Sequence, residues 1–340
     1  MKSSKKLGFG IVGVGAIGKV HAQNLAGNVP RATLVGIADA YIEVAKKVGE
    51  SLGIENIYSD YRKLLEDKDV DAIVVATPPF VKREIVVAAA ESGKHVFVEK
   101  PMALSLEDAD EMISRSSKAG IKLQIGYQRR FDAAFVRAEK SIASGEIGKI
   151  LLVKSFTRDP PGNPQGWTTD PKMSGGIMLD TCSHDFDAIR FLTKSEVTSV
   201  YAAGVNLIYP QLKTHGEVDN VVVTLRLANG ALAYVDSCQY TVYGYDIAAE
   251  VLGMKGAVHI GIGRNSAVKV LGKETEFTDY PQTFQERFGQ AYRDELVDFC
   301  NCILENREPR VTGKDGRAAI EIGLAARLSM SKDAPVSLSA

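Results

Sequence analysis

The sequence predicts an α/β protein of two domains: a Rossmann domain with a doubly wound parallel sheet, then an α+β domain with a broad, mostly antiparallel sheet. Three observations predict this fold. Short β-rich runs alternate with helical runs up to about residue 127, a glycine-rich turn follows the first run, and strand-like segments dominate after residue 150. The length of 340 residues also favours two domains. We expect the first domain at residues 1–127 and a second, substrate-binding and oligomerising domain at residues 128–340. The final helix is a candidate to pack back on the first domain.

The expected strands of the first domain are short apolar runs: Leu7–Val12, Thr33–Ala38, Ala72–Ala76, His95–Val98 and Leu123–Tyr127. Between them, helical periodicity predicts helices such as Ile42–Leu52, Val81–Glu91 and Leu106–Ala119. The second and third strands are too apolar for a half-exposed sheet. They suit a sheet that is covered by helices on both faces.

The second domain begins with a helix expected at Asp132–Ser144 and a strand at Ile150–Phe156. A loop rich in Pro, Gly and polar residues follows (Thr157–Gly175), and then a helix from about Gly176 to Leu192. Further strands are expected at Val197–Asn206, Val218–Leu227, Ala231–Tyr240, Ile247–Leu252 and Val268–Leu271, and closing helices at about Phe284–Glu305 and Arg317–Ser331. This half of the chain has many expected strands and few expected helices. We therefore expect one face of the sheet to lack helix cover and to serve as an oligomer interface.

Composition excludes several classes of partner. The formal net charge is −1 with both signs mixed along the chain, so we expect no binding to nucleic acid or to an anionic membrane. No stretch approaches the ~20 apolar residues of a membrane span. The basic start, Met1–Lys6, runs into a strand pattern rather than an apolar signal segment. The four cysteines form no CxxC pair or metal-ligand spacing. We therefore expect a cytoplasmic protein without a metal.

A glycine-rich turn, Gly13-Val14-Gly15-Ala16-Ile17-Gly18, follows the first expected strand and opens a helix. In this context GxGxxG predicts a dinucleotide site. The first glycine allows the tight turn, the second admits the pyrophosphate, and the third lets helix and strand pack closely. The pyrophosphate would lie at the N-terminus of the helix.

Asp39 ends the second strand, where a carboxylate can accept hydrogen bonds from the ribose hydroxyls. A 2′-phosphate would meet that carboxylate, and Ala40-Tyr41-Ile42 offer no arginine to compensate. The sequence therefore predicts NAD rather than NADP. Thr77-Pro78 follows the third strand at the carboxyl edge, where ligands bind in such sheets, although a structural turn explains these residues equally well.

Two further segments carry groups for chemistry. Glu99-Lys100-Pro101 ends the strand His95–Val98 and would place an ammonium where a nicotinamide ring lies. Asp180 and His184 are four residues apart, so on one helix they would share a face. A carboxylate beside an imidazole favours its protonated form and orients it for proton transfer. The alternatives without function are that Lys100 is an ordinary solvated lysine, and that Asp180 and His184 are only a pair on a helix surface.

These motifs, in this order and spacing, resemble the Gfo/Idh/MocA oxidoreductase family over nearly the whole chain. The matching residues are the glycine turn with His21 after it, Thr77-Pro78, Glu99-Lys100-Pro101, Ser174-Gly175-Gly176 with Asp180 and His184, and Gly313-Lys314-Asp315-Gly316-Arg317. The resemblance implies that Lys100 and His184 flank the centre of hydride transfer. It also implies that the C-terminal sheet builds homodimers or homotetramers.

Within that family the chain resembles the inositol dehydrogenases, through Gly126–Asp132 and Tyr243-Gly244-Tyr245-Asp246. This implies a polyol substrate contacted by Arg130, Asp159, Trp167 and Tyr243. Ordinary strand aromatics are the alternative for Tyr243. The chain departs from the family at Lys82, where many members have histidine. Its Thr157–Pro161 loop also lacks the His or Asn that some inositol enzymes place nearby.

The expected reaction is NAD-dependent oxidation of a secondary hydroxyl of a cyclic polyol or sugar. His184, oriented by Asp180, would take the proton while Lys100 stabilises the developing alkoxide, and these two roles are interchangeable. The expected cofactor-contacting residues are Gly13, Gly15, Ala16, Ile17, Gly18, Asp39, Thr77, Pro78, Glu99 and Lys100. Two alternatives stay open. One is a dehydrogenase or reductase for another sugar, such as an aldose, a sugar acid or a keto-inositol; the other is a non-catalytic nucleotide sensor.

Overall fold

The structure is a computed structural model that describes residues 6–261, 270–271, 273, 276–277 and 279–338. It divides into two compact units. The first contains the chain up to Phe131 together with Gln290–Ala318, and the second contains Asp132–Gly289 together with the residues from Ala319 on. Most of the basic start, Met1–Lys6, lies outside the described residues.

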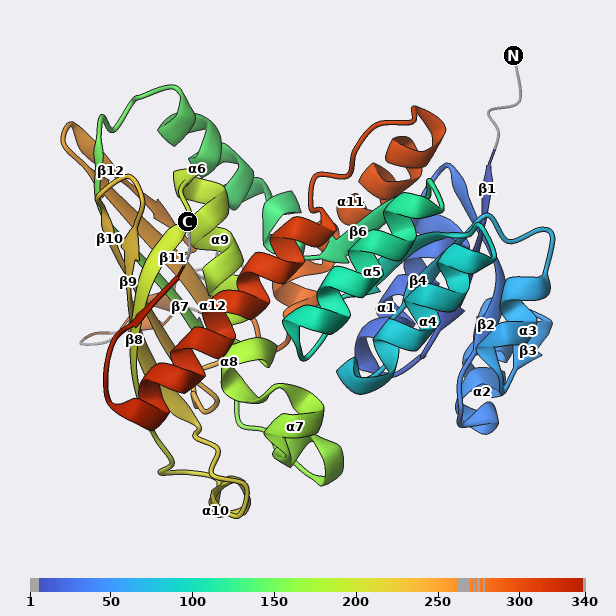
Figure 1. Ribbon diagram of the computed structural model, residues 1–340, viewed down its shortest axis with the longest axis horizontal. Helices are drawn as coiled ribbons and strands as arrows, with labels where there is room; N and C mark the ends of the chain where they lie inside the picture. Colours follow the sequence, from blue (N-terminus) through green and yellow to red (C-terminus); the bar gives the residue numbers. More distant parts are fainter. Residues whose placement is uncertain (1–5, 262–269, 272, 274–275, 278, 339–340) are drawn as a thin grey trace. The chain divides into compact units, whose positions relative to one another are not determined.

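The first unit contains a six-stranded sheet in the order β3-β2-β1-β4-β5-β6, with every strand pair parallel (Figure 1). The strands are β1 (Leu7–Val12), β2 (Ala32–Ala38), β3 (Asn56–Tyr58), β4 (Ala72–Val75), β5 (His95–Glu99) and β6 (Leu123–Gly126). This order confirms the predicted Rossmann fold. The chain reverses its direction of travel across the sheet between β1 and β4, and ligands bind at the carboxyl end of such a switch point.

Helices cover both faces of this sheet. They are α1 (Ala16–Gln23), α2 (Ile42–Leu52), α3 (Tyr61–Glu66), α4 (Pro79–Glu91) and α5 (Leu106–Lys118), with the π-helical turn η1 (Asn24–Asn28) and the 3-10 helix η2 (Gln128–Phe131). On one face, Ala22 of α1, Val48 of α2 and Phe299 of α11 (Phe284–Leu304) join a single buried cluster with the strands. On the other face, α3, α4 and α5 supply buried residues such as Leu64 and Met112. The near-continuous burial of β1 and β4 follows from this double cover.

The second unit is built on a seven-stranded sheet in the order β12-β11-β7-β10-β9-β8-β15. Its strands are β7 (Ile150–Arg158), β8 (Val197–Val205), β9 (Asn220–Leu227), β10 (Leu232–Cys238), β11 (Asp246–Gly253), β12 (Gly256–Ile260) and β15 (Val336–Ser337). In this sheet β7 and β10 pair in parallel and the other pairs are antiparallel, which confirms the predicted broad, mostly antiparallel sheet. Of the strand expected at Val268–Leu271, residues 268–269 lie outside the described residues. Val270–Leu271 forms β13, which pairs with β14 (Glu276–Phe277).

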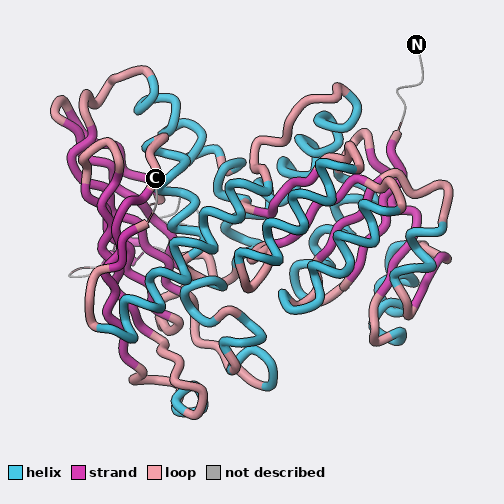
Figure 2. Tube along the Cα trace, in the orientation of Figure 1, coloured by secondary structure: helices cyan, strands magenta, loops and turns pink. Residues whose placement is uncertain are grey.

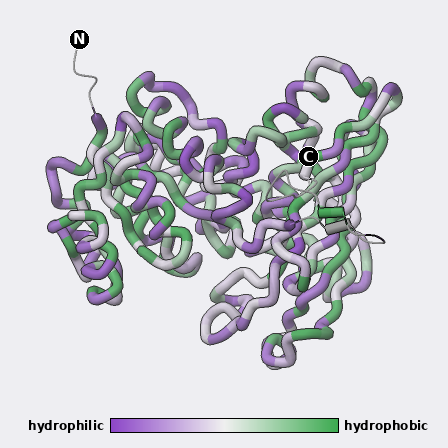
Figure 3. Tube along the Cα trace, turned by 180° about the vertical axis from the view of Figure 1, so that it is seen from behind, coloured by the Kyte–Doolittle hydropathy of each residue, from purple (hydrophilic) through white to green (hydrophobic). Residues whose placement is uncertain are grey.

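Helices lie on one side of this second sheet (Figure 2). The helices of the unit are α6 (Ala133–Ala143), η3 (Gly166–Thr169), α7 (Pro171–Ser174), α8 (Gly176–Asp180), α9 (Ser183–Thr193), α10 (Pro210–Lys213) and most of α12 (Gly313–Lys332). The buried cluster joins Phe135 of α6, Phe186 of α9 and Ile322 of α12 to alternate strand residues such as Val223 and Val235. Hydrophobic and hydrophilic residues therefore alternate along these strands (Figure 3).

The opposite face of this sheet carries exposed apolar side chains. Leu252, Leu152 and Leu232 are in register across the neighbouring strands β11, β7 and β10. Leu232 is 48% exposed and Leu252 39%, and Val222 on β9 is 51% exposed. The name open sheet face is used below for the surface formed by Leu152, Leu232, Leu252, Val222 and Tyr201.

Over the described part of the chain, no helix has the length and apolar character that a membrane crossing needs.

Candidate active site

The glycine turn has the geometry that a dinucleotide site needs. Gly13 has a φ of 88°, and a Cβ added there would lie 2.9 Å from the carbonyl carbon of Ala76. A Cβ on Gly18 would collide with the carbonyl oxygen of Gly13, so α1 packs against the turn only because residue 18 is glycine. At Gly15 an added Cβ would meet no atom within 4 Å. The N-terminus of α1 therefore presents its backbone to open space, as a pyrophosphate requires.

Asp39 lies beside this turn, at the end of β2. Its Oδ2 accepts a hydrogen bond from the N–H of Val14 at 2.9 Å, and its Oδ1 accepts from the N–H of Tyr41 at 2.9 Å. Each carboxylate oxygen has a second lone pair for a ribose hydroxyl. Thr77, after β4, has a buried hydroxyl without a hydrogen-bond partner among the described residues. The turn, Asp39 and this orphaned hydroxyl fit a bound NAD.

Lys100 follows β5 at the same carboxyl edge of the first unit's sheet, and the turn that carries it is held from two sides. The N–H of Lys100 donates to Oε2 of Glu99 at 3.1 Å, and Oε1 of Glu99 lies 2.7 Å from Nε2 of His21. Glu99, an expected cofactor contact, is thus buried in hydrogen bonds within the unit. Lys82, which is 2% exposed, donates from Nζ to the carbonyl oxygens of Glu99, Lys100 and Pro101 at 2.6, 3.1 and 3.0 Å.

Asp180 and His184 do not share the face of one helix, and that expectation is wrong. Asp180 is the last residue of α8 and is exposed, whereas His184 is the second residue of α9 and is buried. The helix breaks because the N–H of Cys182 bonds to the carbonyl of Ile177, five residues back, at 2.9 Å. The i, i+4 relationship therefore does not apply between Asp180 and His184.

Asp185 fixes the start of α9 against the sheet. Its Oδ1 accepts a hydrogen bond from the Ser155 hydroxyl at 2.5 Å, and its Oδ2 accepts from the Thr157 hydroxyl at 2.6 Å. All three side chains are buried. Asp185 therefore sets the position of the adjacent His184 relative to β7.

The expected substrate contacts lie in different surroundings. Arg130, in η2, is buried and donates to Oδ1 of Asp315 at 2.9 Å and to the carbonyl of Arg310 at 3.3 Å. Asp159 directly follows β7 and is half-buried, and Trp167 lies in η3 and is exposed. The structure thus gives Arg130 a structural partner, whereas the other two lie on the Pro-rich loop.

Tyr243 belongs to a charged network that spans the adjacent strands β11, β7 and β10 of the second sheet. Its hydroxyl donates to Oδ2 of Asp246 at 3.1 Å and accepts from Arg158 at 3.4 Å. Arg158 also pairs with Asp236 at 2.7 Å. Burial raises the pKa of the Asp246 carboxyl and of the Tyr243 hydroxyl above their usual values. Polar groups of this kind can bind hydroxyls of a sugar ring.

A separate depression of about 470 Å³ lies in the second unit. Its lining residues come from the Pro-rich loop and from the region of α10: Asn163, Pro164, Gln165, Gly166, Thr169, Gln211 and Thr214. None of these side chains titrates near neutral pH, so this depression lacks a group for proton transfer.

The structure thus gathers Gly13, Gly15, Gly18, Asp39, Thr77 and Lys100 at one edge of the first sheet. Asp180, His184, Asp159 and Tyr243 belong to the second unit. Sequence reasoning missed the roles of Lys82, Asp185 and Glu295. Glu295 lies on the buried face of α11 with Tyr292, Leu296 and Phe299. A carboxylate among the apolar residues of a helix face is the sequence signal that could have identified it.

Two family profiles match the chain. The profile of the oxidoreductase family with an NAD-binding Rossmann fold matches residues 7–127, and that of the GFO/IDH/MocA C-terminal domain matches residues 135–259. The predicted Rossmann fold and NAD as the cofactor are therefore confirmed.

Relatives of known activity match almost end to end. The scyllo-inositol 2-dehydrogenase (NAD(+)) of Bacillus subtilis is 38% identical over 96% of this chain and 95% of its own. The myo-inositol 2-dehydrogenase of Thermotoga maritima is 36% identical over 97% and 98%. The crystal structure of scyllo-inositol dehydrogenase from Lactobacillus casei, with bound NAD(H) and scyllo-inositol, superposes with a TM-score of 0.91 at 30% identity. That match covers 98% of this chain and 99% of that chain.

Proposed function

Because the chain belongs to the Gfo/Idh/MocA oxidoreductase family, we propose that it oxidises a secondary hydroxyl of an inositol, a cyclic polyol of sugar metabolism, with NAD. One observation carries the proposal: the dinucleotide turn, Lys100 and His184 occur together in a chain that matches inositol dehydrogenases over almost its full length. A silent nucleotide sensor would need neither Lys100 nor His184.

NAD would be held by residues of the first unit. The backbone of Gly13, Gly15, Ala16, Ile17 and Gly18 would surround the pyrophosphate, Asp39 would bind the adenosine ribose, and Thr77-Pro78 would line the carboxyl edge. When bound, NAD supplies the hydride acceptor. The protein supplies orientation and electrostatics.

The proton is handled by side chains. We assign His184 as the general base that takes the proton of the reacting hydroxyl, with Asp180 supporting its charge. The ammonium of Lys100 donates a hydrogen bond to the same oxygen and stabilises the negative charge that develops there. Asp180 and His184 belong to separate helices, so they are not held on one helix face as the sequence spacing suggests. Asp180 would instead stabilise the protonated His184 through its negative charge.

Substrate hydroxyls would be bound by Asp159, Trp167 and Tyr243. Tyr243 offers a hydroxyl that already bridges Arg158 and Asp246, so it presents a polarised donor and acceptor. Arg130 is also proposed as a substrate contact, because its bonds to Asp315 and to the Arg310 carbonyl use one N–H of Nη2 and one of Nη1, and each of these atoms carries a second N–H.

We also propose that the open sheet face joins subunits into a homodimer or homotetramer in the cytoplasm. The register of Leu252, Leu152 and Leu232 supports this, because it forms an apolar row across adjacent strands. The free state of all four cysteines fits a reducing compartment.

The experiment is a spectrophotometric assay of NADH formation over a panel of inositols, aldoses and sugar acids. We expect the highest kcat/KM for an inositol. Preference for an aldose or a sugar acid by more than about tenfold, or 1.4 kcal/mol, would replace this proposal with the rival dehydrogenase. NAD binding without turnover of any member would favour the sensor.

A further inference from the structure

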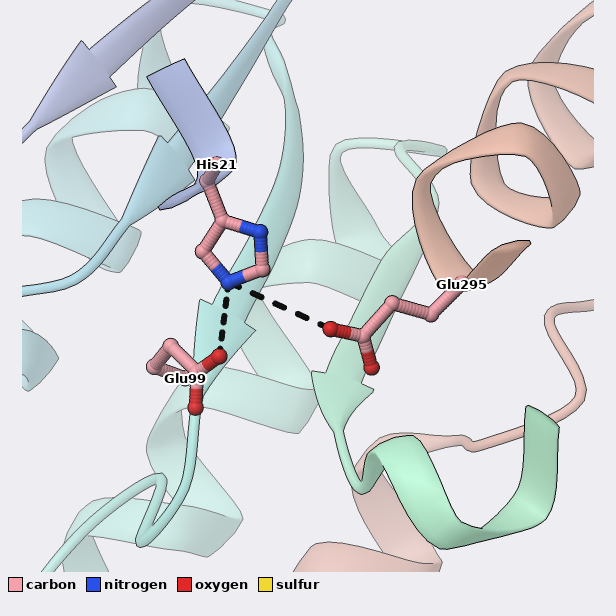
Figure 4. Close-up of side chains that lie close together, drawn as sticks. All are labelled: His21, Glu99 and Glu295. Carbon is pink, nitrogen blue, oxygen red and sulfur yellow. Dashed lines mark hydrogen bonds and ion pairs between the residues drawn. The ribbon is translucent and has the colours of Figure 1, made fainter. Parts of the chain in front are cut away.

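Three buried side chains of the first unit, His21, Glu99 and Glu295, lie close together (Figure 4), and Glu99 directly precedes Lys100 in the chain. They come from α1, β5 and α11. Nε2 of His21 lies 2.7 Å from Oε1 of Glu99 and 3.9 Å from Oε1 of Glu295. Such a group is expensive to bury unless its charges balance and its hydrogen bonds are made.

The contacts of His21 show which of its ring nitrogens faces Glu99. Nδ1 of His21 is buried and has no hydrogen-bond partner among the described residues. The ring therefore makes its hydrogen bond through Nε2, which donates to the carboxylate of Glu99. Phe97 and Tyr292 enclose the ring edge to face, with centroids at 5.2 and 6.0 Å.

Glu295 is the neutral acid of the cluster. Neither of its oxygens has a hydrogen-bond partner among the described residues, and the side chain is fully buried. Burial, and then the charge of Glu99, raise the pKa of Glu295 well above its usual value. Two carboxyl groups this close hold one proton between them, so Glu99 and Glu295 together carry one negative charge instead of two.

A positive charge contacts the backbone of the turn that carries Lys100. The buried ammonium of Lys82 donates to the carbonyls of Glu99, Lys100 and Pro101, which matches its three N–H donors. The Glu99 carboxylate takes the N–H of Lys100 at 3.1 Å. The backbone around Lys100 is therefore held at its N–H by an anion and at its carbonyls by a cation.

We propose that His21, Glu99, Glu295 and Lys82 are positioning residues that form a charge-balanced clamp, fixing the backbone of Lys100 so that its ammonium reaches the reacting hydroxyl. This rests on the role of Lys100 in the proposed function. The clamp acts through Lys100 and does not touch substrate.

A bound cation is the competing explanation, since all three groups of the cluster have ligand atoms within 4.8 Å of one another. The geometry argues against it. Two ligands at about 2.0–2.2 Å from one tetrahedral zinc are separated by roughly 3.3 Å. The 2.7 Å between His21 and Glu99 is a hydrogen-bond distance instead.

The test measures kcat, KM and NAD affinity for the single variants Glu99→Gln and Lys82→Met. Each should lower kcat by about tenfold to a hundredfold, the cost of misplacing a reacting group by about 1 Å, and leave NAD affinity within about threefold. Asp294→Asn, one residue from Glu295 and partnered by Gln290, is the matched control that should behave as the parent. Wild-type turnover in both single variants would overturn the clamp. If Glu99→Gln does not fold, Lys82→Met alone decides.

Glu295 tests the shared proton. Glu295→Gln keeps a neutral donor of the same shape and should retain at least about a third of the turnover, whereas Glu295→Leu should lose about tenfold. Equal loss in both would show that an ionised Glu295 is needed and would overturn the assignment. One equivalent of a divalent metal in the purified enzyme, absent from Glu295→Gln, would overturn it in favour of a cation site.

The double variant Lys100→Ala/Glu99→Gln separates this inference from the proposed function. If the clamp works through Lys100, Glu99→Gln should cost less than about threefold once Lys100 is gone. If Glu99→Gln lowers kcat by the same factor with and without Lys100, the clamp is overturned and the role of Lys100 stays intact. Normal turnover of Lys100→Ala alone would instead refute the proposed function.

Discussion

The carboxylate of Asp39 accepts a hydrogen bond from the backbone N–H of Val14, inside the glycine turn, at 2.9 Å. The residue that we propose binds the ribose therefore also fixes the loop that we propose binds the pyrophosphate. Cofactor choice and loop geometry are coupled at this one side chain.

Replacing Asp39 with serine should narrow the preference for NAD over NADP by about tenfold in kcat/KM, since a 2′-phosphate would no longer face a carboxylate. Affinity for NAD should also fall, because Val14 loses its acceptor. Steady-state kinetics with both cofactors check this, with Glu43→Gln on the neighbouring helix as a charge-matched control. Equal turnover of the two cofactors by the parent protein would contradict the account.

Removing the Asp185 carboxylate should destabilise the second unit. In Asp185→Ala the buried hydroxyls of Ser155 and Thr157 lose their acceptor, at about 1–3 kcal/mol for each. Thermal unfolding should show a lower Tm, by about 2–4 °C per kcal/mol. Ser155→Ala should cost less, because it removes one donor while the Asp185 carboxylate keeps its bond from the Thr157 hydroxyl. A Tm for Asp185→Ala within a degree of the parent would show that the anchor is unimportant.

The sequence predicts most of the first unit because local patterns decide it. Ile42–Leu52 forms α2 with the expected bounds, since an amphipathic stripe and a glycine at the C-cap act together. The sequence predicts a single helix across Thr181–Cys182, where the structure has a break. The residues on both sides of the break favour a helix. The hydrogen bond that fixes α9, between Asp185 and Ser155 of β7, joins residues far apart in the sequence, so a local pattern does not contain it. Glu295 and Lys82 were missed for a related reason. Their partners come from other elements of the chain, which a local pattern does not contain.

Charge on the open sheet face should dissociate the oligomer. Leu232→Glu or Leu252→Glu would place a carboxylate in the apolar row, where burying it without a partner is costly. Light scattering should give a dimer or tetramer for the parent and a monomer for either variant, while Lys47→Glu on α2 should keep the parent's mass. A monomeric parent at micromolar concentration would rule out the assembly.

Thiol reactivity should follow burial. Burial raises the pKa of Cys300 and of Cys302 to about 12, and Cys182 is also buried. Only Cys238 is partly exposed among the four cysteines, so a native sample should react with an aromatic disulfide at about one thiol per chain. Cys238→Ser should abolish this fast reaction, and urea should expose the remaining thiols. Rapid reaction of three or more thiols in the folded protein would contradict the buried assignment.

We propose that Lys100 and His184 act on the same hydroxyl. The most direct measurement pairs NAD affinity with turnover of the best inositol for Lys100→Ala and His184→Ala across pH 6–9. We predict a loss of roughly 10²–10³ in kcat for Lys100→Ala and roughly 10²–10⁴ for His184→Ala. NAD affinity should change little, because the turn and Asp39 hold the other end of the cofactor. Near-normal turnover of His184→Ala over this pH range would remove the histidine as base, and near-normal turnover of both variants would place the chemistry elsewhere.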